Sequence, residues 1–188
     1  MGAYIPENLG FRLTPSERGI INIYSTPRLV QRFLSDEIAY NYGETTRSFR
    51  EVVRQRKADC LEGALTAAAI LQCQGMSILL LDLRVTPAPG LDHVVFILST
   101  DAGYGAIGKS RDQRLGGRPP VYPDFERLAE SYLEPMDIGN SRLHSFGVLD
   151  LSRLAGINWR VGQNIGNVID HLNRAKHYEI NPKGKSKR

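Results

Sequence analysis

The sequence predicts one α+β domain in which a central helix packs against an antiparallel sheet. The first observation is an alanine-rich run, GALTAAAILQCQG, that follows Asp59-Cys60-Leu61-Glu62. The second is a series of three strand-like runs at residues 77–85, 93–100 and 103–109. The third is the turn Asp101-Ala102, which joins the last two runs as a hairpin. A buried helix followed by an antiparallel meander is an α+β arrangement, and 188 residues fit one domain.

The residues before the central helix predict an irregular beginning and two helices. Residues 1–25 show no clear periodicity, so we expect an irregular N-terminal arm that includes a short helical turn at residues 15–19. Thr26-Pro27 resembles an N-cap followed by proline at the first helical position. The spacing of apolar residues then predicts a helix over residues 28–40 and a shorter one over residues 46–56.

The central helix has clear start and stop signals. Asp59 and Glu62 have the spacing of a capping box, and Gly75 is typical of a helix end. The run between them is rich in alanine, the best helix former. Its small side chains suit a helix that is packed closely on all sides, and we expect this helix to be central to the fold.

Two more helices are predicted after the sheet, over residues 124–132 and 163–175. We see no linker long enough to separate two domains, so residues 26–180 are predicted to form the domain. Residues 181–188 carry four basic residues and no acidic residue. We interpret them as a disordered basic tail, with contact to nucleic acid or another anionic surface as the alternative.

The composition and the spacing of the cysteines and histidines limit the kinds of functional site that the chain can form. The net charge is +4, and without the basic tail the domain is nearly neutral. Cys60 and Cys73 fall on different faces of one predicted helix, about 20 Å apart along its axis, which is too far for a disulfide. No Cys/His spacing matches a zinc site, so we expect neither a metal nor another cofactor.

The chain lacks the pattern of a secretory signal and an apolar run long enough to cross a membrane. We therefore expect no membrane association and a cytoplasmic location.

Cys60 is the first candidate for chemistry because it falls at the first position of the central helix. Backbone N–H groups point outward at a helix start, and the helix dipole favours a thiolate there. Asp59 and Glu62 act against this, since nearby anions raise the pKa of a thiol. Judged by residue type alone, such a cysteine is more often a small buried hydrophobic residue than a nucleophile.

His93 is the second candidate because it opens a strand that follows a Pro/Gly loop. If the sheet packs on the central helix, the imidazole can accept the proton of Cys60 and later donate one to a leaving group. A third group should orient the ring. Asp112 and Ser110 are the candidates, and Asp112 is the better one because a carboxylate also stabilises the imidazolium. The alternative is that both are polar residues at a strand end.

In this order of residues the chain resembles the transglutaminase-like superfamily, whose fold is similar to that of papain-type cysteine peptidases. The matching segments are DCLEGALTAAAIL, GMSILLLDL, LDHVVFIL, YGAIGKSRDQRLGGRPPVY and LAESYLEP. They are closest to a little-characterised bacterial group of that superfamily, and the resemblance covers residues 26–159. It implies Cys60 as nucleophile and His93 as general base. The family's triad aspartate falls near Ser110, and the nearest acidic residue is Asp112.

The resemblance implies chemistry on amides, either hydrolysis or acyl transfer to an amine, through a thioester on Cys60. A peptide or protein is the expected substrate. Arg111, Arg114 and Arg118 are candidates for binding a carboxylate-bearing substrate, unless they bond nearby carbonyls instead. A second hypothesis is an inactive member of the same fold that binds a peptide or protein. We do not expect nucleic-acid binding, because no aromatic-interleaved basic motif accompanies the tail.

Overall fold

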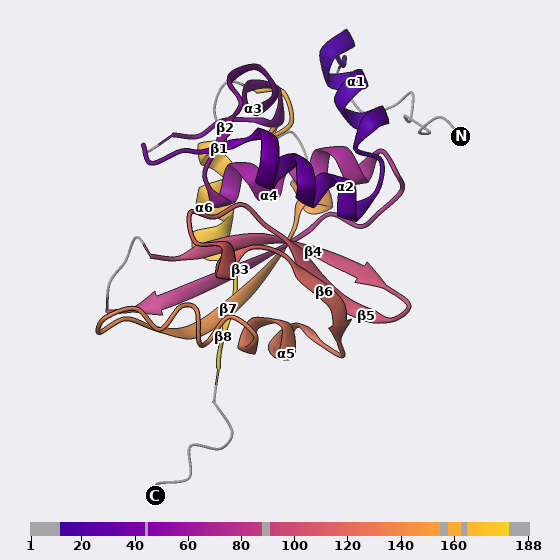
Figure 1. The fold of residues 1–188 in the computed structure, drawn as a ribbon. Helices are drawn as coiled ribbons and strands as arrows, with labels where there is room; N and C mark the ends of the chain where they lie inside the picture. Colours follow the sequence, from indigo (N-terminus) through magenta and orange to yellow (C-terminus); the bar gives the residue numbers. More distant parts are fainter. Residues whose placement is uncertain (1–11, 44, 88–90, 155–157, 163–164, 181–188) are drawn as a thin grey trace, which may run out of the picture.

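The computed structural model describes residues 12–43, 45–87, 91–154, 158–162 and 165–180. They form a mixed α+β fold built on a six-stranded antiparallel sheet, which confirms the predicted class. Figure 1 shows most helices on one side of this sheet and α5 on the other. The strand order is β6-β5-β4-β3-β7-β8. The strands are β3 (Leu79–Thr86), β4 (His93–Thr100), β5 (Gly103–Ile107), β6 (Arg118–Tyr122), β7 (Arg142–Asp150) and β8 (His177–Glu179).

The predicted hairpin is present as β4 and β5, which pair from Phe96 with Ile107 to Thr100 with Gly103. Side chains on the two inner strands alternate between two cores. Leu80 on β3 and Phe96 on β4 contribute to a first core. Their neighbours Leu81 and Val95 contribute to a second core on the opposite face. Because both faces of the sheet are covered, the sequences of β3 and β4 are nearly continuous runs of apolar residues.

The central helix α4 (Cys60–Gln72) packs on the first face, as predicted. The Asp59 side chain accepts a hydrogen bond from the Glu62 amide, and the Glu62 side chain accepts one from the Asp59 amide. Both halves of the predicted capping box are therefore formed. Every residue from Leu61 to Leu71 is buried. Gly63 lets α4 approach the segment after β5, because a Cβ at this position would lie 2.5 Å from Lys109 Cβ.

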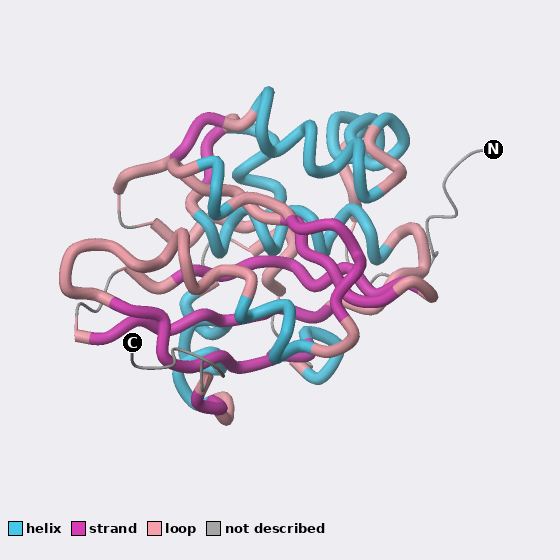
Figure 2. The backbone as a smooth tube through the Cα atoms, turned by 60° about the horizontal axis from the view of Figure 1, so that its bottom comes forward, coloured by secondary structure: helices cyan, strands magenta, loops and turns pink. Residues whose placement is uncertain are grey.

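The helical turn predicted at residues 15–19 is present and is longer than expected, because α1 extends over Pro15–Ile23. The irregular course predicted for residues 20–23 is therefore wrong. Thr14 and Glu17 form a capping box at its start, and Ile20 and Ile21 are buried in the first core. Thr14 and Glu17 have the spacing of a capping box, so the start of this helix can be recognised in the sequence. In Figure 2 the N-terminal helices, drawn in cyan, lie together over one face of the strands.

The predicted helix over residues 28–40 is shorter than expected. It is divided into α2 (Pro27–Arg32) and a π-helical turn, Phe33–Glu37. The chain then becomes extended in β1 (Ala39–Tyr40), which pairs in parallel with β2 (Lys57–Ala58). The Ala39 amide donates to the Arg56 carbonyl at 2.9 Å, so tertiary pairing replaces the last helical turn. The next predicted helix is present as α3 (Phe49–Gln55).

The two C-terminal helices cover different faces of the sheet. Helix α5 (Phe125–Glu130) contributes Leu128 and Ala129 to the second core. Helix α6 (Gly166–Arg174) contributes Val168 and Leu172 to the first core. The predicted tail at residues 181–188 lies outside the described residues. Within the described ranges, no helix combines the length and apolar character needed to cross a bilayer.

Candidate functional site

Cys60 is the first residue of α4, as the sequence predicts, and it is partly exposed. Burial raises the pKa of its thiol to about 12, and the negative charge of Asp59 acts in the same direction. The backbone N–H groups of Val94, Leu61 and Cys60 itself lower that pKa, but their effect is smaller. The thiol is therefore protonated at neutral pH. The helix start supplies the predicted donors without producing a thiolate.

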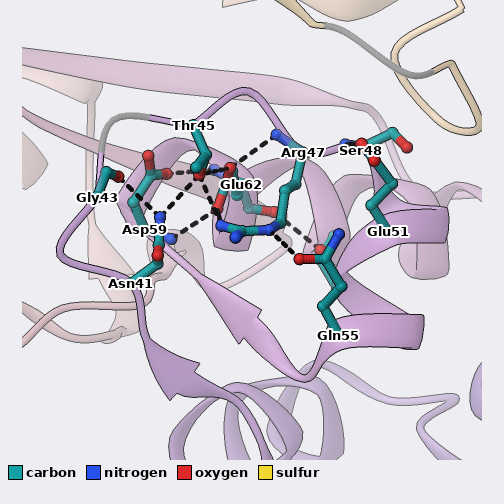
Figure 3. Close-up of polar contacts among 10 residues, drawn as sticks. Asn41, Gly43, Thr45, Arg47, Ser48, Glu51, Gln55, Asp59 and Glu62 are labelled. Carbon is teal, nitrogen blue, oxygen red and sulfur yellow. Dashed lines mark hydrogen bonds and ion pairs between the residues drawn. The ribbon is translucent and has the colours of Figure 1, made fainter.

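A buried carboxylate, Glu62, fixes the loop beside the start of α4. It accepts hydrogen bonds from Thr45 Oγ1 at 2.6 Å, from the Arg47 amide at 2.7 Å and from the Asp59 amide at 3.0 Å. The Arg47 guanidinium lies 3.5 Å from the same carboxylate, and it also donates to Gln55 Oε1 at 2.7 Å. Figure 3 shows these groups converging from the loop and from α3 on the start of α4. The network therefore holds the loop against the helix.

Glu62 also influences the pKa of the neighbouring Asp59 side chain. Burial and the neighbouring Glu62 raise the pKa of Asp59 to about 6. The residue next to Cys60 therefore titrates close to neutral pH. Arg47 is a partner of Glu62 in this network, a contact that the spacing of charges along one helix cannot reveal.

His93 begins β4, as predicted, and its side chain is buried at 3% exposure. Its ring Nε2 donates a hydrogen bond to the Leu115 carbonyl oxygen at 2.7 Å. The ring centroid lies 6.0 Å from that of Tyr132, a residue of the second core. Burial lowers the pKa of His93 to about 4. The imidazole is therefore neutral and is held by groups of the second core.

Cys60 and His93 are not joined by a hydrogen bond in the part of the chain that the structure describes. The strand alternation accounts for this. Val94 points into the first core, on which α4 packs, whereas His93 shares the opposite face with Val95. The thiol instead lies beside the Val94 backbone N–H. The catalytic roles given to Cys60 and His93 thus stay predictions.

The two candidates for the third catalytic group have other partners. Asp112 accepts hydrogen bonds from Arg114 Nε at 3.2 Å and from an Arg114 terminal nitrogen at 2.7 Å. Ser110 Oγ accepts one from the Asp112 amide at 3.2 Å. The group that orients the His93 ring is the main-chain carbonyl of Leu115. A carbonyl gives no residue-type signal, so the sequence offers no means of identifying it.

The three predicted substrate-binding arginines differ in their contacts. Arg114 is paired with Asp112 at 2.7 Å and with Glu134 at 3.4 Å. Arg118 donates to the carbonyls of Gly117 at 3.1 Å and of Ser131 at 3.2 Å, and its guanidinium lies 3.9 Å from the centre of the Tyr132 ring. Arg118 thus bonds nearby carbonyls, the alternative that the sequence left open, whereas Arg114 is paired with carboxylates. Arg111 is exposed and has no hydrogen bond or ion pair with the described residues.

Arg111 lies in a groove of about 1090 Å³ between α2 and the segment that connects β5 to β6. Gln31 forms part of the groove. Its side chain donates to the Gly108 carbonyl at 2.9 Å and accepts from the Gly108 amide at 3.0 Å, so α2 is fixed to the end of β5. The ionisable side chains that line the groove are mostly cationic: Arg28, Arg32, Lys109, Arg111, Arg118 and the single carboxylate Asp112, with Tyr40 and Tyr42.

Lys109 contributes to the groove wall, but its ammonium group points inward. Its Nζ donates to the Leu34 carbonyl at 2.8 Å, and burial lowers its pKa. It is therefore anchored to the turn after α2. Arg32 is close to Asp36, at 3.8 Å, on the solvent side. Arg28 and Arg111 remain as lining arginines whose side chains have neither an ion pair nor a hydrogen bond with the described residues.

The groove passes close to Cys60. Tyr40 lines the groove, and burial together with the charges of Cys60 and Asp59 raises the pKa of Tyr40 to about 12. The positive charge of Arg111 acts on the same phenol in the opposite direction. Tyr40 is therefore coupled electrostatically both to the start of α4 and to Arg111 in the groove. No local signal in the sequence identifies Tyr40, because Asp59 and Cys60 belong to one distant segment and Arg111 to another.

No protein-family model matches this chain, and no match was found among curated proteins. The transglutaminase-like resemblance therefore rests on the residues and their order alone.

Proposed function

We propose that this chain is a peptide-binding protein and that its ligand is an extended, acidic segment held in the groove beside Cys60. The observation that carries the proposal is the charge of the groove. Its lining includes five basic side chains and one acidic side chain. Arg28 and Arg111 have no ion-pair partner among the described residues. Oppositely charged groups on a ligand would therefore be recognised at little cost to existing contacts.

The size and the lining of the groove support a peptide as its ligand. Its volume of about 1090 Å³ is just above the range of roughly 300–1,000 Å³ that small-molecule pockets occupy. Tyr40 and Tyr42 lie in the lining, and tyrosines combine a large contact area with a polar group at low entropic cost.

A transglutaminase-like architecture is part of this proposal. A helix that begins at Cys60 and an adjacent antiparallel strand that begins at His93 support it. Cysteine-dependent amide chemistry is the second candidate function, and the donors around Cys60 favour it. In that reaction the thiolate would attack an amide carbonyl, form a thioester and release an amine that takes up a proton. Water or a second amine would then release the acyl group.

The pKa values of Cys60 and His93 in the ligand-free protein favour the binding function over the catalytic one. Burial raises the pKa of the Cys60 thiol to about 12 and lowers that of the His93 imidazole to about 4, so proton transfer from the thiol to the imidazole is strongly unfavourable. A substrate would have to change both environments before His93 acted as base. Binding in the groove requires no such change.

The direct test is the affinity of fluorescent peptides measured by anisotropy. Three ten-residue peptides of equal length would differ only in having acidic, neutral or basic side chains. We expect the acidic peptide to bind most tightly and its affinity to fall as salt increases. Arg111→Gln should weaken its binding by about tenfold, the effect of one charged hydrogen bond.

Arg54→Gln is the matched control, because Arg54 is exposed on α3 and does not line the groove. This variant should retain the affinity of the parent chain. Equal affinity for the three peptides, or equal effects of the two arginine substitutions, would exclude specific recognition in the groove. Release of an amine from a bound peptide, lost in Cys60→Ser, would establish the second candidate function instead.

A further inference from the structure

A second groove, of about 850 Å³, lies at the edge of the sheet where β7 extends beyond β8. Strand β7 pairs with β3 as far as Asp150, whereas β8 pairs only with residues 145–147 of β7. Val148, Leu149 and Asp150 therefore lie beyond the paired part of β8, and all three line the second groove. The groove thus follows a stretch of β7 that β8 leaves uncovered.

The lining of the second groove is mostly apolar and comes from both faces of the sheet. Phe125, Phe146 and Val148 pack with the second core, and Leu149 and Leu154 pack with the first. Because the two cores lie on opposite faces, the groove turns around the edge of β7. A flexible alkyl chain can follow such a bend, which a rigid ring system cannot do. Its transfer from water to this lining is favourable.

Tyr178 on β8 forms a further part of the lining and is 49% exposed. Its ring centroid lies 5.7 Å from that of Phe146, so the two rings continue one apolar surface. The ammonium group of Lys176 lies 4.7 Å from the centre of the Tyr178 ring. This cation–π contact holds a positive charge at the rim of the groove.

The lining contains one carboxylate, Asp150, and its charge is already engaged. One of its oxygens accepts hydrogen bonds from the Ser152 amide at 2.9 Å and from Ser152 Oγ at 2.6 Å. The other lies 3.4 Å from Arg153 Nε. Asp150 and Arg153 therefore offset each other, and the remaining basic side chains of the lining have no acidic partner in it.

Those remaining basic side chains are Arg174 and Lys176, with the imidazole of His171 beside them in the lining. Arg174 is exposed and forms neither a hydrogen bond nor an ion pair with the described residues. It lies in the last turn of α6, where the helix dipole favours a cation. Lys176 lies beyond that helix, so the dipole does not account for the second charge. The rim is therefore positive without a matching carboxylate.

We propose that the second groove binds a free medium-chain fatty-acid anion. Its alkyl chain follows the apolar lining around the edge of β7, and its carboxylate lies at the rim with Arg174 and Lys176. A guanidinium donates two parallel hydrogen bonds to a carboxylate, which makes Arg174 the main contact of the head group. The proposal does not depend on peptide binding, because the two grooves share no lining residue.

Isothermal titration calorimetry of the full chain tests the ligand class. Decanoate, kept below its micelle concentration, should bind at millimolar concentration or below. Octanoate should bind about fifteenfold more weakly, because each buried methylene group contributes about a factor of four to affinity. Decyltrimethylammonium has the same alkyl length and the opposite charge, and it should bind at least about tenfold more weakly than decanoate.

Amide chemical shifts of the ¹⁵N-labelled chain locate the ligand. Decanoate should shift the amides of Val148, Leu149, Lys176 and Tyr178 and leave that of Gly108 in the first groove unchanged. Shift changes confined to other surfaces would overturn the proposal. So would binding to anionic lipid vesicles without binding of decanoate, because the occupied surface would then be a membrane contact.

Variants at the rim complete the test. Arg174→Gln and Lys176→Gln should each weaken decanoate binding by about fivefold, and both positions are exposed, so the fold should be retained. Arg54→Gln and Arg111→Gln are the controls and should leave the decanoate affinity unchanged, because neither residue lines the second groove. Equal affinity for the anionic and cationic amphiphiles, or equal affinity in all four variants, would contradict the proposal.

Discussion

His93 Nε2 and the Leu115 carbonyl oxygen are joined by a hydrogen bond of 2.7 Å. The carbonyl can only accept, so the hydrogen is on Nε2 and the lone pair is on Nδ1. This bond orients the ring as the third member of a triad would, but it supplies no negative charge. Burial outweighs the small gain that this bond gives the imidazolium and lowers the pKa of His93 to about 4.

The first prediction concerns the reactivity of Cys60. In a Cys73→Ser background, the rate of alkylation by iodoacetamide should still be rising at pH 10, because the thiol pKa is about 12. His93→Ala should leave this pH profile unchanged. Thiol reactivity measured across a pH series checks both statements. An apparent pKa below 8.5 that increases in His93→Ala would instead establish a thiolate–imidazolium pair.

The second prediction concerns Asp59, whose charge raises the pKa of the neighbouring thiol. Asp59→Asn keeps a good N-cap residue but removes the charge. The pKa of Cys60 should therefore fall, and alkylation at pH 9 should become several-fold faster. Glu51→Gln is the control, since it removes a capping carboxylate from α3 instead. An unchanged rate in Asp59→Asn would contradict the assigned cause.

Asp59 should also make the free energy of unfolding of the chain depend on pH. Its pKa in the folded chain, about 6, is higher than the ordinary value of 3.8. A group with a raised pKa contributes stability that is fully present below the unfolded-state pKa and is lost as the pH rises through the folded-state pKa. Relative to Asp59→Asn, the parent chain should lose on the order of 2 kcal/mol between about pH 4 and pH 7. Urea unfolding at each pH measures this, and a constant difference would contradict it.

The third prediction concerns the contact between α4 and Lys109. Gly63→Ala places a Cβ 2.5 Å from Lys109 Cβ, so it should destabilise the fold by about 1–3 kcal/mol. Gly19→Ala in α1 is the matched control. No atom lies within 4 Å of the added methyl group there, and alanine is the better helix former. Urea unfolding should show opposite signs for the two variants, and equal effects would refute the close approach.

The parts of the fold that the sequence predicts well depend on local signals. The capping box at Asp59 and Glu62 and the short turn at Asp101-Ala102 are examples, and both are present in the structure. Helix α1 has an equally local signal in Thr14 and Glu17, which the sequence analysis overlooked. The predicted helix over residues 28–40 ends early because β1 pairs with β2, a contact between distant segments.

The candidate site depends on such distant contacts and was predicted less completely. The position of Cys60 at a helix start follows from local capping. The face on which His93 lies depends on how β4 is oriented between two cores, and both faces of that strand are apolar. The partners of Arg47 and Arg118 are side chains and carbonyls brought together by folding. Charge patterns along the sequence cannot identify them.

The most direct test of the central claim is a titration of the ¹⁵N-labelled chain with the acidic ten-residue peptide, followed by amide chemical shifts. Binding in the groove predicts shift changes at Gly108, Arg111, Gly117 and Tyr40, with none in α5 or β8. The Arg111→Gln variant should require about tenfold more peptide for the same changes. Shift changes confined to other surfaces, or none at millimolar peptide, would contradict the claim that this groove binds an acidic segment.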